Sequence, residues 1–266
     1  KYQPKLFVFE NVLGLRSAGD YLNKMKALFA QSGKGYHLHD TLLNAKDFGV
    51  LQDRRRVIIL GWQQDIEFVI PKFKPIQHNF KVADVLNDLP FIRAGEGKEK
   101  YLQYKGSVNK YLERFSIRNG IEILTQHKAR PNTEQDKEIY RIAVEKWKTS
   151  KERLKYPDLP LKLRTHKNET AFLDRFKVVG DEEPSSHTVV AHVSKDGHYY
   201  IHPDARQNRS LTVREVARLQ SFPDDYFFEG EKEGKTQTSA FKRIGNAVPP
   251  LLAFSIAHKL KCHFFN

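Results

Sequence analysis

The stretch LFVFENV at residues 6–12 joins a short apolar run to a polar Glu-Asn pair. A continuous apolar run of this length is typical of a strand that is buried on both faces of a sheet. Apolar residues at helical spacing follow over 18–31, and Gly33 and Gly35 end that helix. A second β-branched run, VIILGW at 57–62, predicts another strand. Strand, helix and strand in this order predict an α/β layer with a parallel sheet.

The character of the sequence changes after about residue 71, where prolines and glycines begin to interrupt any regular pattern. One helix is expected over 134–149, from its apolar residues at helical spacing. Residues 188–201 are predicted to form a hairpin, because the Asp-Gly pair at 196–197 is a strong turn signal. We therefore expect a separate, less regular domain over roughly 75–205.

Regular structure is expected to return at Thr212. Thr212 and Glu215 have the spacing of a capping box, in which each side chain bonds the other residue's backbone N–H. The helix that they begin is predicted to end at the Phe-Pro pair of 222–223. A last helix is predicted to begin at 249–250, since proline in a first turn costs no hydrogen bond.

The composition excludes several classes of protein. The chain has 266 residues, a net charge of +13 and one cysteine, Cys262. One cysteine allows neither an internal disulfide nor a cysteine-based zinc cluster. No run of 18 apolar residues and no signal-peptide pattern is present, so we expect a soluble, cytoplasmic protein. The sequence begins at Lys1 and its one methionine is Met25, which favours a fragment of a longer protein.

The positive charge is concentrated in the middle of the chain. Residues 91–180 hold 21 Lys and Arg against 12 Asp and Glu, a surplus of nine. A basic segment of this kind is the electrostatic footprint of a polyanionic partner. A solvated basic surface without a partner is equally compatible with the count. Charge alone does not distinguish DNA from RNA.

Three charged residues are candidates for chemistry. Glu10 follows a predicted strand at its carboxyl end, where open α/β sheets bind their ligands. A desolvated carboxyl group there could donate a proton near neutral pH, although a surface glutamate gives the same pattern. Arg54 and Arg56 flank the start of the second strand and should point the same way. Two such guanidiniums could hold a phosphate or a base edge, or could simply form a basic strand edge.

Two further groups are candidate binding sites. Residues 245–249, GNAVP, lie at a helix N-terminus, whose N–H groups could receive a polar ligand group. A helix start without a ligand has the same local sequence. His192, His198 and His202 suggest a metal, but they lack a recognised ligand spacing. We therefore predict no metal site and interpret these histidines as polar residues of the hairpin.

Four blocks of the chain, taken in order, resemble conserved blocks of the cytosine-5 DNA methyltransferases. They are PKLFVFENVLGL at 4–15, FGVLQDRRR at 48–56, RSLTVREVARLQSFPD at 209–224 and RIGNAVPP at 243–250. The resemblance implies a partial Rossmann-like α/β methyltransferase domain with an inserted, less regular target-recognition domain. By this resemblance, 1–74 is the second half of the catalytic domain and 75–230 the target-recognition domain and hinge. Residues 231–266 return to the catalytic domain.

The resemblance also implies roles in catalysis and cofactor binding. Glu10 would pair with the ring nitrogen and exocyclic amine of a flipped cytosine while a cysteine attacks carbon 6. Arg56, with Arg54 beside it, would contact the carbonyl oxygen of that base. Three residues would line the pocket for S-adenosylmethionine, the implied methyl donor: Asn246, Ala247 and Val248.

Five residues would contact or support double-stranded DNA by the same resemblance: Asn11, Gln52, Thr188, Val189 and Arg209. Thr188-Val189 is similar to the pair through which the recognition domain meets the neighbourhood of the flipped nucleotide. Asn11 would brace the loop after Glu10. Arg209 would be structural as much as DNA-facing, within a block that organises the recognition domain.

Two family blocks are absent from the chain, and one position departs from the pattern. The glycine-rich cofactor loop and the Pro-Cys nucleophile block are missing, and Arg243 stands where the family commonly has glutamine. The resemblance therefore implies the C-terminal portion of a DNA cytosine-5 methyltransferase, inactive alone, from a restriction-modification system. Its N-terminal half would belong to the same chain or to a second polypeptide. The alternatives are a non-catalytic DNA-recognition subunit, a regulatory homologue or, with less support, an RNA-modifying enzyme.

Overall fold

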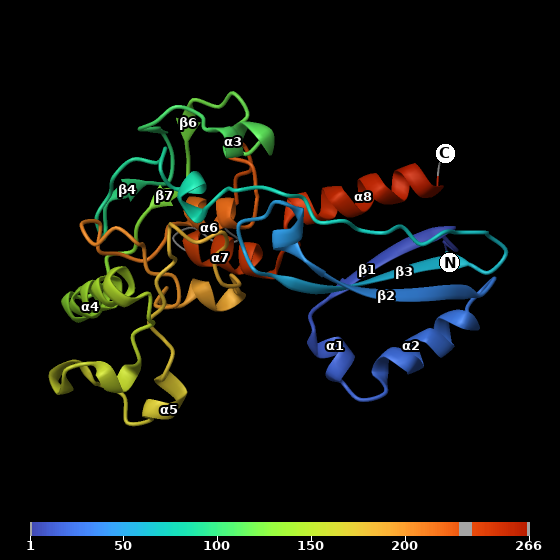
Figure 1. The fold of residues 1–266 in the computed structure, drawn as a ribbon, viewed down its shortest axis with the longest axis horizontal. Coiled ribbons are helices and arrows are strands. Elements are labelled where there is room, and N and C mark those ends of the chain that lie inside the picture. The colour runs from blue at the N-terminus through green and yellow to red at the C-terminus, as the bar shows by residue number, and fades with distance from the viewer. Residues whose placement is uncertain (1, 229–235, 265–266) are drawn as a thin grey trace. The chain divides into compact units, whose positions relative to one another are not determined.

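The computed structural model describes residues 2–228 and 236–264, and these fall into two compact units (Figure 1). The first unit comprises the residues up to His78 together with those from Pro250 onward, and the second comprises Asn79–Pro249. Among the helices that the structure describes, none has the length and apolar character needed to cross a bilayer.

The first unit contains a three-stranded sheet. Its strands are β1 (Leu6–Asn11), β2 (Tyr36–Asn44) and β3 (Arg55–Gln63), in the order β1-β3-β2. Both pairs are antiparallel, so the prediction of a parallel sheet is wrong. The sequence YHLHDTLLN of β2 is too polar to be recognised as a buried strand. A short connection then leads directly into β3, and a connection of that length joins antiparallel strands.

The positions of the strands in the sheet determine their burial. In central β3, Ile58, Ile59 and Leu60 are fully buried, as the apolar run predicts. In β1, by contrast, Val8 and Phe9 are exposed. The expectation that β1 is buried on both faces is therefore wrong for the described structure, because β1 is an edge strand with one neighbour.

Helices cover the sheet of the first unit on both sides (Figure 1). They are α1 (Gly14–Ser17), α2 (Tyr21–Ala30) and α8 (Pro250–Phe264). The predicted helix over 18–31 is confirmed by α2, whose Leu22 and Met25 pack on the cluster formed by Leu15, Val57 and Ile59. Leu28, which shares their helical spacing, is exposed. The predicted start of the last helix is confirmed by α8, with Pro250 at its first position.

The second unit is built largely from short elements and loops. It begins with η2 (Val82–Val85), α3 (Lys110–Arg114) and two antiparallel pairs of two-residue strands, β4 (Gly97–Lys98) with β7 (His127–Lys128) and β5 (Leu102–Gln103) with β6 (Ile123–Leu124). It continues with α4 (Glu134–Ser150), η3 (Tyr156–Asp158), η4 (Leu161–Leu163), α5 (Glu169–Phe172), η5 (Ala191–Ser194), α6 (Val213–Leu219) and α7 (Thr236–Asn246).

Helix α4 confirms the helix predicted over 134–149. Thr133 and Asp136 form a capping box at its start, and Lys151 adopts a left-handed conformation at its end. Its buried face, which includes Ile139 and Ala143, belongs to an apolar cluster of the second unit. That cluster also contains residues from the loops between 154 and 178, so α4 supplies the regular surface on which these loops pack.

The hairpin predicted over 188–201 does not form. Helical turn η5 occupies its first half, and Ile201 makes isolated bridges to Val178 and Ser210 instead of pairing within the segment. The Asp196 carboxylate accepts the backbone N–H of His198 at 3.1 Å and forms an ion pair with Arg175. The Asp-Gly pair therefore makes an Asx turn that is held by a distant arginine, not a hairpin turn.

The capping box of α6 is confirmed by two hydrogen bonds. The Thr212 N–H donates to Glu215 Oε2 at 2.7 Å, and the Glu215 N–H donates to Thr212 Oγ1 at 3.3 Å. The helix ends at Leu219, before the predicted Phe-Pro pair, since Ser221 takes a left-handed conformation with φ of 61°. Helix α7 has no counterpart among the predicted elements, because its sequence TQTSAFKRIGN is mostly polar.

Candidate functional site

Glu10 and Arg56 meet on one face of the sheet in the first unit. Glu10 on β1 lies opposite Ile58 of β3, and Arg56 is two residues before Ile58. The two side chains are therefore diagonal neighbours on the same face, within reach of a long side chain. Arg56 Nε lies 2.7 Å from Glu10 Oε1. The geometry is that of a charge-assisted hydrogen bond between an arginine and a carboxylate.

Both members of this pair are largely withdrawn from solvent. The side chain of Arg56 is 10% exposed and that of Glu10 is 26% exposed. Burial lowers the pKa of Arg56, while the adjacent Glu10 carboxylate opposes that decrease. Arginine remains charged under these conditions, because its ordinary pKa lies far above neutral pH. The site thus presents a partly accessible carboxylate whose orientation is fixed by a buried cation.

Arg54 lies immediately before β3, two residues ahead of Arg56. Arg54 and Arg56 are buried, whereas Arg55 between them is exposed. Asn44, the last residue of β2, accepts the Arg54 N–H on its side-chain oxygen at 3.0 Å and donates to Asp53 at 2.8 Å. Asn44 therefore fixes the backbone that leads into Arg56. We did not predict its role, although an asparagine just before a helical turn is a recognisable signal.

Asn11 and Gln52, both predicted to contact or support DNA, have local roles in the structure. The side-chain oxygen of Asn11 accepts the backbone N–H of Val12 at 2.8 Å, so Asn11 braces the end of β1. Gln52 is fully buried. The structure therefore places Gln52 inside the first unit and not on its surface.

In the second unit, Tyr200 shapes the segment that contains Thr188 and Val189. The Tyr200 hydroxyl donates to the Thr188 carbonyl at 3.1 Å and accepts the Val190 N–H at 3.0 Å. Val189 is fully buried, whereas Val190 is 44% exposed. One buried hydroxyl thus bridges two backbone groups on either side of Val189. We did not predict this role of Tyr200, because a hairpin over 188–201 places Tyr200 in a strand.

Gly245 of α7 lies against the same segment. A Cβ atom on Gly245 would come within 2.3 Å of the Ala191 nitrogen and 2.4 Å of the Val190 carbonyl carbon. Contacts this close exclude any side chain, so glycine is required for the helix and the segment to pack together. The glycine of the predicted cofactor block therefore has a packing role in the second unit.

Arg209 lies in the interior of the second unit. Its side chain is fully buried and forms two hydrogen bonds to Glu215, at 2.7 and 2.8 Å. It also donates to the carbonyl of Ile92 at 2.9 Å. A guanidinium held in this way joins the loop that contains Ile92 to the start of α6.

Asn246 ends α7, and Ala247 and Val248 follow it in the short connection to α8. Asn246 is exposed, and Ala247 and Val248 are half-buried. The Ala247 N–H donates to the carbonyl of Ile244 at 3.1 Å, which closes the last turn of α7. The three residues are accessible for contact with a small molecule, and they form one short strip of backbone and small side chains.

The histidines considered as metal ligands occupy separate environments. His198 bonds the Tyr140 hydroxyl at 2.7 Å, and His202 is buried beside Glu215. The interpretation of these residues as polar hairpin residues is wrong, because the hairpin does not form and His202 is buried. Among the residues that the structure describes, no group of three possible ligands is placed to hold a metal ion.

The fold of the chain is similar to the folds of two solved structures, both of them methyltransferases by description. A prophage-encoded E. coli protein that is assigned as a DNA modification methyltransferase has a similar crystal structure, with a TM-score of 0.67. The similarity covers 99% of this chain and 71% of that protein, at 23% sequence identity. A methyltransferase of Entamoeba histolytica matches over 97% of this chain and 63% of its own, with a TM-score of 0.52 and 13% identity.

Sequence comparison then identifies the family. The family model for C-5 cytosine-specific DNA methylases matches residues 1–262, and the chain belongs to that family. The type II methyltransferase M.Bpa9945I of Bacillus paralicheniformis is 42% identical, over 98% of this chain and 61% of its own length. M.DdeI of Desulfomicrobium norvegicum is 32% identical, over 100% of this chain and 65% of its own length. The chain thus spans somewhat less than two thirds of the length of these relatives.

Proposed function

We propose that this chain is the C-terminal portion of a DNA cytosine-5 methyltransferase, which transfers a methyl group to carbon 5 of a flipped cytosine. The proposal rests on the ion pair between Glu10 and Arg56. Arg56 Nε lies 2.7 Å from Glu10 Oε1, near one end of the paired strands β1 and β3. The family membership and the type II relatives support DNA as the substrate and restriction-modification as the context.

Glu10 is the proposed contact for the pyrimidine edge that is attacked. A carboxyl group at this position can hydrogen-bond the ring nitrogen and the exocyclic amine together. A proton held on the ring nitrogen lowers the barrier to nucleophilic attack at carbon 6. Arg56 keeps the Glu10 carboxylate in place. When a cytosine is bound, Arg56 would also donate to the carbonyl oxygen of the base. A cytosine must leave the duplex to reach such a site, at a cost of about a few kcal/mol.

S-adenosylmethionine is the methyl donor that the family implies. It would supply an electrophilic methyl group at the face of the bound base. Asn246, Ala247 and Val248 fit one wall of its pocket, since Asn246 is exposed and the other two are small and half-buried. Those three residues offer only part of a site. The rest of the donor pocket, including a glycine-rich loop, is assigned to residues outside this sequence.

The nucleophile is likewise assigned to residues outside the 266 of this chain. Cys262, the one cysteine in the sequence, is exposed on α8, near the end of that helix. It lacks the preceding proline of the family's nucleophile block. We propose that an N-terminal catalytic half, in the same chain or a second polypeptide, supplies the cysteine and covers the exposed Val8 and Phe9 of edge strand β1.

The second unit is proposed to be the recognition domain. It contains the basic stretch over 91–180, whose surplus of nine positive charges suits the phosphates of double-stranded DNA. Thr188 and Val189 would approach the flipped nucleotide, on a segment held by Tyr200 and Gly245. Base-edge contacts of other residues would then determine the recognition sequence.

The proposal is tested with Glu10→Gln in the complete enzyme that contains this chain. Methyl transfer from labelled donor to DNA should fall by about 10²–10⁴-fold, the usual contribution of a positioned acid or base. DNA affinity should change little, because the side chain remains polar and of the same length. Exposed Glu67→Gln, in the same unit, is the matched control and should retain activity. Equal losses of methylation and DNA binding would give Glu10 a purely structural role.

A second measurement separates the enzyme from its alternatives. The pure 266-residue chain should bind DNA and should transfer no methyl group, and turnover by the chain alone would contradict the assignment of the nucleophile. If the complete protein binds DNA but never methylates it, the chain is a recognition subunit or a regulatory homologue. Preferential modification of RNA would favour the RNA-modifying alternative.

A further inference from the structure

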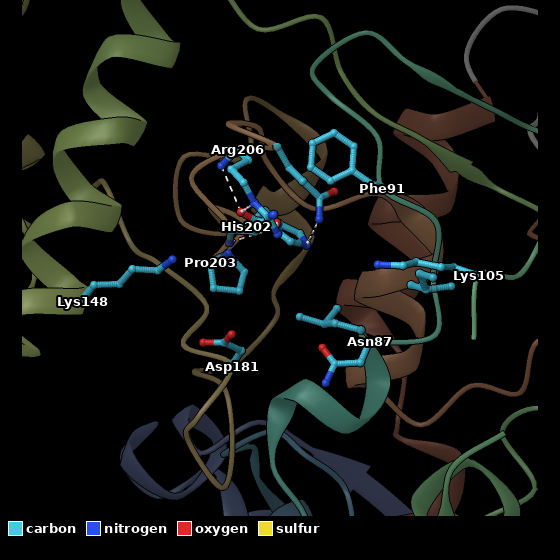
Figure 2. Close-up of a pocket in the computed structure, with 12 residues that line it drawn as sticks. Asn87, Phe91, Lys105, Lys148, Asp181, His202, Pro203 and Arg206 are labelled. Atoms are coloured by element: carbon cyan, nitrogen blue, oxygen red, sulfur yellow. Dashed lines mark hydrogen bonds and ion pairs between the residues drawn. The ribbon is translucent and has the colours of Figure 1, made fainter. Parts of the chain in front are cut away.

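A polar cleft of about 390 Å³ lies within the second unit, and none of the residues that line it is assigned to catalysis (Figure 2). Its volume is within the range of about 300–1,000 Å³ that is typical of small-ligand sites. The residues that line it come from the segment after η2, the end of α4, the loops that contain Lys105 and Asp181, and the loop after Ile201. Its walls are mostly polar, unlike the apolar walls of a usual drug-binding pocket, which indicates a charged ligand.

Two lysines point into this cleft from opposite sides. Figure 2 shows Lys148, from α4, and Lys105, from the loop before α3, directed toward the same hollow. No carboxylate in the described part of the chain lies within salt-bridge distance of either ammonium group, although Lys148 is near enough to Glu182 for a weaker attraction. The two ammonium groups therefore remain available to a phosphate that enters between them.

An aromatic ring forms part of the cleft wall. Phe91 is 42% exposed, and its ring has Arg206 Cζ at 5.9 Å and Arg93 Cζ at 6.0 Å from the centroid. The Arg206 guanidinium is held by Asp204 through two hydrogen bonds, of 3.0 and 2.9 Å. Both guanidiniums lie over the ring at the outer limit of a cation–π contact, and the exposed part of the ring offers a surface on which a nucleobase can stack.

Several neutral polar groups in the cleft can form hydrogen bonds. His202 is buried there, and its Nδ1 accepts the Asp204 N–H at 3.1 Å. Burial lowers the pKa of this imidazole and keeps it neutral at physiological pH. Asn87 and Gln207 contribute amide groups, which both donate and accept. Asp181 contributes a carboxylate, which can accept the amine of a base but opposes a phosphate placed next to it.

From this arrangement we infer that the cleft binds one unpaired nucleotide, with its base on Phe91 and its phosphate between Lys105 and Lys148. Aromatic stacking, amide hydrogen bonds and paired cations together match a base and its phosphate. An acidic peptide would use the lysines but would leave the ring unused. A nucleotide in a duplex has both faces of its base stacked, so the ligand must come from a single strand, an extruded position or a free nucleotide.

The test measures binding to the 266-residue chain by titration calorimetry, with two ligands: a free nucleoside monophosphate and a short single-stranded oligonucleotide. Phe91→Leu should weaken binding of at least one ligand by about ten-fold, which is the usual effect of losing one stacked base. Lys105→Gln with Lys148→Gln should weaken it further. The slope of log affinity against log salt should become shallower by about 0.7 for each phosphate that the lysines no longer neutralise. Exposed Phe254→Leu and Lys24→Gln, both outside the basic stretch, are the matched controls and should bind as the parent does.

The two ligands distinguish the sources of the nucleotide. Weaker binding of both ligands indicates a site for free nucleotides, and weaker binding of the oligonucleotide alone indicates a site for a nucleic-acid strand; either result supports the inference. Unchanged affinity for both ligands in the cleft variants, or an equal decrease in the control variants, would overturn it. Binding of an acidic peptide that is insensitive to Phe91→Leu would also overturn it. None of these measurements requires methyl transfer, so failure here leaves the proposed catalytic function untouched.

Discussion

Arg218 of α6 holds Asp88, 130 residues away along the chain, through two hydrogen bonds of 2.5 and 3.0 Å. The same guanidinium binds Asp224, at 2.9 and 2.6 Å, and donates to the Val85 carbonyl. All three charged side chains are essentially inaccessible to solvent. The two carboxylates raise the pKa of Arg218 despite its burial, and Arg218 lowers the pKa of Asp224. The cluster joins η2 to α6 in the middle of the second unit.

Arg218→Met is expected to destabilise the second unit strongly. Removing one partner from a buried ion pair usually costs about 3–5 kcal/mol. Without Arg218, only longer ion pairs are described for the two carboxylates: Asp88 with Arg118 at 3.3 Å and Asp224 with Arg214 at 3.6 Å. Denaturant unfolding of the chain measures the change in free energy. Exposed Arg141→Met, on α4, is the matched control and should remain within about 0.5 kcal/mol of the parent.

If Arg218→Met fails to fold, Arg218→Lys still tests the explanation. Lysine keeps the positive charge but cannot form the planar fork of hydrogen bonds to both carboxylates, so it should retain part of the stability that methionine loses. An Arg218→Lys variant as unstable as Arg218→Met would show that packing and hydrogen-bond geometry, and not the charge, dominate at this site.

Features that depend on neighbouring residues could be predicted from the sequence, whereas features that depend on residues far apart in the chain could not. Thr212 and Glu215 are three residues apart, so their capping box could be predicted from spacing alone. The turn at Asp196 could not, because Arg175 and the distant partners of Ile201 determine its conformation. Glu10 and Arg56 are adjacent in space through the pairing of β1 with β3, and the sequence linked them only through the family resemblance.

Stability should decrease in mild acid because of buried histidines. Burial lowers the pKa of His127 and that of His187 to about 4, and the pKa of His202 to about 3, against 6.5 for an ordinary histidine. Below pH 6.5 the unfolded chain binds protons that the folded chain does not. The contribution of these neutral histidines to the free energy of unfolding is therefore complete above pH 6.5. It is lost as the pH falls toward 4, at up to about 1.4 kcal/mol per pH unit for each histidine.

Unfolding free energies between about pH 6.5 and 4.5 test this expectation, in a range above the ordinary pKa of glutamate. His202→Gln should reduce the slope against pH by about one proton, whatever it does to stability at neutral pH. His127→Gln should reduce it by a similar amount, although loss of its bonds to Thr212 and Pro90 will also lower stability. A slope unchanged in both variants would contradict the assignment.

Gly245→Ala and Gly14→Ala should change stability in opposite directions. Both glycines lie in helices, where alanine is ordinarily favoured by about 0.5–1 kcal/mol. A methyl group on Gly14 would meet only Val12, at 3.9 Å, so that variant should be neutral or stabilised. On Gly245 it would collide with the backbone of Val190 and Ala191, which should cost about 1–3 kcal/mol. Thermal unfolding of the two variants gives the comparison, and stabilisation by Gly245→Ala would refute the close packing.

The Tyr200 hydroxyl should control the local opening of the segment around Val189. Tyr200→Phe removes the acceptor for the Val190 N–H and the donor to the Thr188 carbonyl. One net hydrogen bond contributes about 0.5–1.5 kcal/mol, and a buried group left without a partner costs about 1–3 kcal/mol. Hydrogen exchange at Val190 should therefore become roughly ten-fold faster, since about 1.4 kcal/mol corresponds to a factor of ten.

Tyr101→Phe, at a ring that is 75% exposed, is the matched control and should leave exchange at Val190 unchanged. Faster exchange confined to 188–194 would show that Tyr200 positions this segment, because a general loss of stability would accelerate exchange throughout the second unit. Unchanged exchange at Val190 in Tyr200→Phe would mean that the packing of Gly245 against Ala191 holds the segment without the hydroxyl. The double variant Tyr200→Phe with Gly245→Ala then measures how strongly the two supports depend on each other.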